Sequence, residues 1–140
     1  MTDITVTAAQ VGRVFPQSDE VYDFVAGAAI TAGQALYLNS SGLVDLYDSN
    51  GSGTLQFLGI ALNKAGSGQA VSVLKRGFVY GFAISGLAYF AAVYGSNTAG
   101  ALADSAGSSS IVAGRVLALP NSGLYTKVLY IQASWNVVSS

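Results

Sequence analysis

The sequence predicts an all-β protein: a small β-barrel or sandwich built from two related β units, with an extended N-terminal arm. Turn signals recur roughly every eight to twelve residues, which is the spacing of short strands in such folds. The runs between the turns alternate with period two, and no long stretch shows strong helical periodicity. A length of 140 residues corresponds to one domain, so we expect residues 1–16 to form the arm and 17–140 a single β domain.

The expected strands are short runs rich in β-branched and aromatic residues, bounded by glycine, serine and asparagine. The linkers between them, at 39–42, 48–53, 65–68 and 105–110, suit tight turns because glycine and asparagine accept positive φ. The expected strands are Val21–Val25, Gln34–Leu38, Leu43–Tyr47, Gln56–Leu62, Ala70–Leu74, Phe78–Phe82, Leu87–Val93, Ile111–Ala118 and Leu124–Ala133.

An internal repeat relates two segments, at about 30–80 and 84–133. Two β units of this size, each too small to bury its apolar face alone, would pack on one another. The alternative is chance matching in a sequence rich in glycine and leucine. The matched positions lie 55 residues apart and are Gly59 with Gly114, Leu62 with Leu117, Gly68 with Gly123 and Val73 with Val128.

Composition excludes several classes of function. The chain has no cysteine and no histidine, which removes disulfides, thiolate metal sites and the commonest general base. Charged residues make up 9% and the net charge is −1, with the six basic residues scattered, so we expect no nucleic-acid partner. The longest uncharged window, 77–103, contains glycine, serine and tyrosine, which weighs against a membrane-spanning helix, and we expect no membrane partner.

Three motifs could carry chemistry, and each has a simpler structural interpretation. Ser72 and Lys75 have the spacing of a serine–lysine dyad, but an odd offset in a strand places them on opposite faces. Residues 48–51 resemble the start of a calcium loop but lack the later glutamate, which favours a turn. A carboxylate cluster could serve glycoside hydrolysis, yet a solvated loop leading into a strand is simpler; it consists of Asp19, Glu20 and Asp23.

We therefore expect no catalytic residue, no metal and no cofactor, and a function based on contact with other proteins. A surface with so few charges is suited to burial, since charge is depleted at interface cores. The segment Thr2–Phe15 is polar and β-branched and could add a strand to a neighbour's sheet edge. The alternative for this segment is a frayed terminus.

A pattern of strands and glycines runs from Ile30 to Tyr80. It comprises an I-x-x-G-x-x-L-Y-L strand, a hairpin through 41–44, the segment FLGIAL at 57–62, VSVL at 71–74 and a Gly-Phe-Val step at 77–79. The second half repeats the theme with VAGRVL at 112–117 and VLYI at 128–131. In these features the chain resembles the head decoration (capsid cement) proteins of tailed bacteriophages, both the lambda-type decoration protein and related small cement proteins.

This resemblance implies a structural virion protein that binds the outer surface of the expanded capsid, as a homotrimer. It would clamp neighbouring subunits of the major capsid protein and stabilise the shell. It would be found on the virion, and in the host cytoplasm during assembly. The resemblance also implies that the N-terminal segment orders on the capsid, which makes the candidate contact residues Thr2, Asp3, Ile4, Thr5, Val6, Thr7 and Arg13.

Two other classes of function stay open. One is a tail, fibre or pilus-like subunit that polymerises through β-strand addition. The other is a carbohydrate-binding module, whose stacking platforms would be Tyr22, Tyr37, Tyr47 and Trp135. Most of these aromatic residues alternate with apolar neighbours, so core packing is the simpler interpretation.

Overall fold

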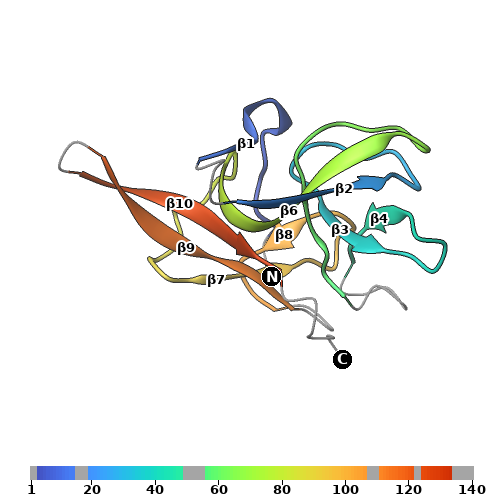
Figure 1. Cartoon of the computed structure of the whole chain (residues 1–140). Coiled ribbons are helices and arrows are strands. Elements are labelled where there is room, and N and C mark those ends of the chain that lie inside the picture. Colours follow the sequence, from blue (N-terminus) through green and yellow to red (C-terminus); the bar gives the residue numbers. More distant parts are fainter. Residues whose placement is uncertain (1–2, 15–18, 49–55, 107–110, 122–123, 134–140) are drawn as a thin grey trace.

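The computed structural model describes residues 3–14, 19–48, 56–106, 111–121 and 124–133. The described chain forms a curled antiparallel sheet of ten strands and one short 3₁₀ helix, η1 (Ala8–Gln10), which confirms the predicted all-β class (Figure 1). The strands are β1 (Gly12–Arg13), β2 (Glu20–Val25), β3 (Ala35–Leu38), β4 (Val44–Leu46), β5 (Gly59–Ala61), β6 (Ala70–Tyr80), β7 (Ala92–Gly95), β8 (Leu102–Ala103), β9 (Val112–Asn121) and β10 (Leu124–Gln132).

The sheet consists of two units with the same pattern of strand pairing. In the first unit β3 pairs with β4 and β5, and β5 forms a hairpin with β6. In the second unit β7 pairs with β8 and β9, and β9 forms a hairpin with β10. The units join where β6 pairs antiparallel with β10, so the strand order β4-β3-β5-β6 is repeated as β8-β7-β9-β10.

Two of the matched glycines lie where a second strand approaches closely. A Cβ on Gly59 in β5 would lie 2.4 Å from the carbonyl oxygen of Leu74 in β6. A Cβ on Gly114 in β9 would lie 2.1 Å from the carbonyl oxygen of Tyr130 in β10. The glycines that match in the sequence therefore occupy corresponding places in the two hairpins.

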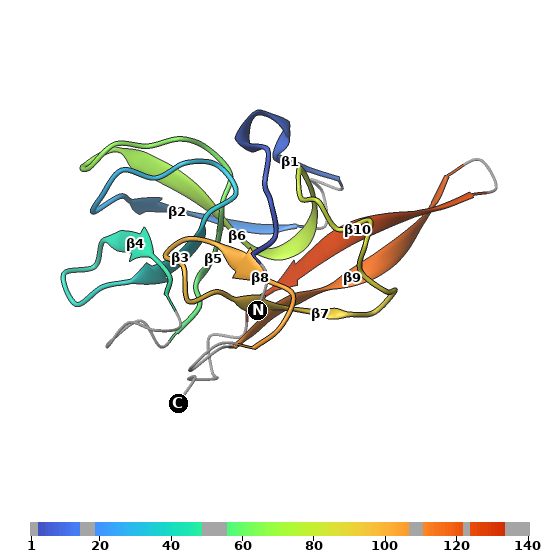
Figure 2. The same ribbon diagram turned by 180° about the vertical axis from the view of Figure 1, so that it is seen from behind.

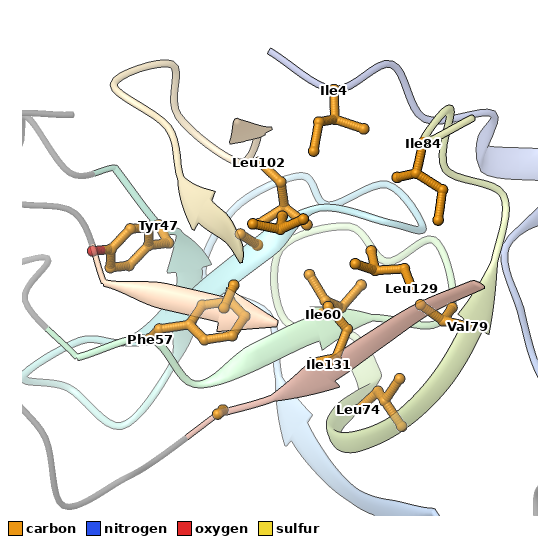
Figure 3. Packing of buried hydrophobic residues seen from close by; sticks show 14 of the residues in the cluster. Ile4, Tyr47, Phe57, Ile60, Leu74, Val79, Ile84, Leu102, Leu129 and Ile131 are labelled. Carbon is orange, nitrogen blue, oxygen red and sulfur yellow. The ribbon is translucent and has the colours of Figure 1, made fainter. Parts of the chain in front are cut away.

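The main hydrophobic core lies inside the curl of the sheet, between the two units (Figure 3). Ile60 of the first unit and Ile131 of the second lie side by side there, and both are fully buried. The rings of Tyr47 and Phe57 meet edge to face at 5.9 Å. A second cluster, which includes Ile30, fills the space within the first unit. Burial of these apolar side chains is the main favourable contribution to folding.

Several local predictions are confirmed and others are wrong. The predicted turn at 39–42 forms because Asn39 Oδ1 accepts hydrogen bonds from the N–H groups of Ser41 and Leu43, while Gly42 adopts a φ of +81°. The two strands expected at 70–74 and 78–82 are one strand, β6, because Gly77 continues the chain at a φ of +150°. The strand expected at 87–93 begins at residue 92 instead, and β1 and β8 were not predicted.

Residues 3–14, the described part of the predicted N-terminal arm, pack on the rest of the chain. Ile4 is buried in the main core and its N–H donates to the carbonyl oxygen of Leu102 at 2.8 Å (Figure 3). The chain then crosses to residues 81–83, where the Thr7 N–H donates to Gly81 and the Ala83 N–H to Thr5. Apolar and polar residues alternate in this segment, so one side of it can be buried. Burial of apolar side chains such as Ile4 and Val6 is more favourable than their exposure to water.

Candidate interaction surface

The three carboxylates of the predicted acidic cluster have separate partners in the structure. Asp19 precedes β2, and its side chain is fully enclosed, with Arg13 Nε as its nearest cation at 3.9 Å. Glu20 lies 3.5 Å from Arg76 Nε. Asp23 is exposed and accepts a hydrogen bond from Ser72 Oγ at 2.9 Å. The three carboxylates thus have different neighbours, and none of them lines the described hollows of the surface.

The enclosure of Asp19 opposes its ionisation. Both carboxylate oxygens are buried, and neither has a hydrogen-bond partner among the described residues. Burial raises the pKa of Asp19, and the nearby Arg13 guanidinium lowers the pKa only in part. Because the folded-state pKa lies above the unfolded value, the ionised group costs stability at neutral pH and costs nothing at a pH below both values.

We expect Asp19→Asn to stabilise the protein at pH 7 by about 1 kcal/mol, since the substitution removes a buried charge without changing the side-chain size. The gain should shrink as the pH falls through the folded-state pKa and vanish below about pH 4. Urea unfolding across this pH range measures it. The matched control is Asp23→Asn at an exposed site, which should change stability little. The expectation would be contradicted if the stability gain of Asp19→Asn over wild type were smaller at pH 7 than at low pH.

The remaining motifs that could carry chemistry are not assembled into sites. Ser72 donates to Asp23, and Lys75 Nζ lies 3.8 Å from Glu20 Oε2, so the two residues of the S-x-x-K motif have different partners. The predicted turn at 48–51 lies mostly outside the described residues. Within the described ranges, no group of three or more acidic residues is placed to hold a metal ion.

The aromatic residues considered for carbohydrate stacking do not share an exposed surface. Tyr47 is fully buried in the main core, which rules it out as a platform. Tyr37 is partly buried against the same core, whereas Tyr22 on β2 is exposed. Trp135 lies outside the described residues.

A different set of apolar residues gathers on the outer side of the second unit. Leu129 and Ile131 of β10 point into the core, so the alternation of the strand turns Tyr130 outward. Its ring lies 4.8 Å from the ring of Phe78 on β6. Next to them is a hollow of about 230 Å³. We call this surface the aromatic face and define it by Phe78, Phe90, Arg115, Leu117 and Tyr130.

Phe90 is held on the aromatic face by its backbone. It has a φ of +65°, the one positive value among the described non-glycine residues, and its N–H donates to the carbonyl oxygen of Val116. Arg115 donates to the Phe90 carbonyl oxygen at 3.0 Å and stacks its guanidinium 4.4 Å from the ring centre. The ring is 63% exposed. A large apolar side chain fixed in this way is available to a partner.

The β9–β10 hairpin extends beyond the aromatic face as a two-stranded ribbon (Figures 1 and 2). β6 pairs with β10 only over Leu129–Gln132, and β7 pairs with β9 only up to Arg115. Over Leu117–Asn121 and Leu124–Val128, the two strands pair only with each other among the described residues. A ribbon of two strands is marginally stable by itself, so this part of the sheet gains from an added partner.

The residues predicted to touch a capsid alternate between the domain and the solvent. Thr2 lies outside the described residues. Ile4 faces the core, and Val6 is half-buried, whereas Thr5, Thr7 and Arg13 are exposed. Asp3 is exposed but tied down, because it accepts a hydrogen bond from the buried Ser96 hydroxyl. Their contact with a capsid stays a prediction.

The aromatic face was not predicted from the sequence. The outward positions of Phe78 and Tyr130 could have been found from strand alternation, but the position of Phe90 depends on a turn that has no glycine. No protein-family model matches the chain, and a search of curated proteins finds no match. Among the described residues, no helix has the length and apolar character needed to cross a membrane.

Proposed function

We propose that this chain is a capsid decoration protein, which binds the outer surface of an expanded phage head as a homotrimer and clamps neighbouring major capsid subunits. The aromatic face is the observation that carries the proposal. It exposes the Phe90 ring at 63% beside a hollow of about 230 Å³, with Arg115 as its single charge. Such a surface suits burial against protein, and the strand pattern of the sequence agrees with this class of protein.

The proposed mechanism is multivalent burial. Each copy contributes a modest interface, and a trimer that contacts several capsid subunits binds through avidity. A protein that binds only the expanded shell stabilises that shell by mass action. No reacting group is needed, which agrees with the separate partners of Asp19, Glu20 and Asp23.

Co-sedimentation tests the proposal, with shells assembled from the major capsid protein encoded in the same genome. We expect saturable binding to expanded shells and none to unexpanded shells. Phe90→Ala should weaken this binding, whereas Tyr89→Ala should not. Tyr89 is a matched control because it is similarly exposed but lies over Lys127 rather than on the aromatic face. Equal binding to both shells, or to neither, would overturn the proposal.

A second candidate is a tail, fibre or pilus-like subunit that polymerises, and the ribbon of β9 and β10 favours it because its β10 edge has no strand partner among the described residues. Light scattering after size exclusion separates the candidates. A closed trimer of fixed mass supports decoration, whereas polymers that lengthen with concentration support the polymerising subunit.

A further inference from the structure

The outer part of β10 has one unpaired edge. Leu129 has Val116 of β9 on one side and Val79 of β6 on the other. Toward the tip, Lys127 pairs with Ala118 of β9 and has no strand on its other side among the described residues. The open edge therefore runs along Leu124–Val128.

The backbone direction on this edge follows from a hydrogen bond farther along the strand. The Ala133 N–H donates to the Lys75 carbonyl oxygen, on the side of β6. Since N–H groups alternate between the two sides of a strand, those of Tyr125 and Lys127 also point away from β9. These two residues thus direct both donors and acceptors at the open edge.

The first unit shows what such an edge accepts. There Leu74 of β6 has Ile60 of β5 on one side and Val21 of β2 on the other. β2 covers β6 over Ala70–Leu74, which is the part that corresponds to the outer half of β10. In the first unit, this edge is thus covered by a strand of the same chain, β2. The corresponding edge of the second unit is open.

The opposite edge of the ribbon is blocked, whereas the β10 edge is not. The Val116 N–H donates to Ala91, away from β10, so position 120 faces the same outer edge of β9. Position 120 is Pro120, which has no N–H to donate, and proline is a common means of preventing strand addition. On β10 the charged residue is Lys127, and its Nζ is held by the carbonyl oxygens of Ser85 and Leu87.

We propose that a second copy of this chain adds a β-strand to the open edge of β10 at Leu124–Val128. The edge is neutral apart from Lys127, whose charge is bound within the chain, and only 9% of the residues are charged. A second copy that approaches this edge therefore meets no strong charge repulsion. The inference rests on the self-association contained in the proposed function. It assigns that self-association to one strand edge and leaves the aromatic face for the capsid.

Three variants of the full chain test the assignment by sedimentation equilibrium. Tyr125→Pro removes an N–H that points to the open edge and leaves the bonds to β9 in place. We expect it to raise the dissociation constant of the oligomer about 100-fold. Tyr125→Thr keeps the N–H and should have little effect. Ala118→Pro lies in the neighbouring Lys127–Ala118 pair, where it removes an N–H that points to the blocked outer edge of β9, and it should also leave the oligomer intact.

Hydrogen exchange of the wild-type protein gives a second readout, which does not depend on whether the proline variant folds. The amides of Tyr125 and Lys127 should become protected as the protein concentration rises. A monomer at every concentration, unchanged exchange at these amides, or an oligomer that survives Tyr125→Pro in a folded protein would each overturn the inference. Capsid binding is measured separately, so an oligomer that binds no shell contradicts the proposed function alone.

Discussion

Gly114→Ala is expected to destabilise the protein by about 3 kcal/mol, because the new methyl group would collide with backbone. Its Cβ would lie 2.1 Å from the Tyr130 carbonyl oxygen and 3.1 Å from the Ile131 Cα. Neither atom can move without shifting β10, which joins the two units. A domain has a total stability of about 5–15 kcal/mol, so the loss is a large share and should be evident in the urea unfolding midpoint.

The corresponding glycine of the first unit provides an internal comparison. Gly59→Ala should also destabilise, since the Cβ would lie 2.4 Å from the Leu74 carbonyl oxygen and the φ is +154°. Gly86→Ala is the matched control, because no atom lies within 4 Å of its Cβ position, and it should change stability by less than about 0.5 kcal/mol. Unfolding midpoints that do not differ between Gly114→Ala and Gly86→Ala would show that β9 tolerates the methyl group.

Phe57→Ala should cost about 3–5 kcal/mol, since it empties a fully buried aromatic position. The Phe57 ring meets Tyr47 edge to face, and Tyr47 in turn packs closely over Gly95 of β7. The cavity would therefore open where a strand of the second unit touches the first. Thermal unfolding followed by calorimetry measures the loss.

Phe90→Ala is the control for Phe57→Ala. It removes the same atoms from a ring that is 63% exposed, so it should cost well under half as much. If the two variants unfolded at the same temperature, the Phe57 ring could not be packed as the structure has it. A Phe90→Ala protein that stays folded would also show that its weakened capsid binding does not come from unfolding.

The fold class could be predicted because the local signals agree with each other. Alternation marked β2, β3 and β4 to within a residue or so, and the turn at 39–42 followed from its Asn and Gly. The repeat was visible because a close approach of backbone requires glycine at the same place in both hairpins. The strand alternation and the turn depend on near neighbours in the sequence.

The candidate surface depends on contacts between distant residues, which one sequence does not encode locally. Phe90 faces outward because Arg115 and Val116, which are distant in the sequence, form hydrogen bonds with its backbone. Asp19 was expected in a solvated loop, but Gly77 leaves room for its carboxylate to be buried against β6. The contact of the N-terminal segment with Leu102 could not be predicted, because Leu102 lies in a strand of two residues. A strand this short leaves no recognisable pattern in the sequence.

The repeated strand order has a consequence for how such a molecule could diversify. If the two units were separate identical chains, symmetry would force both outer edges to be filled or both to be open. Joining them in one polypeptide frees each half to change independently. In this chain β2 covers the edge of β6 in one half, whereas the corresponding edge of β10 has no strand beside it among the described residues of the other half.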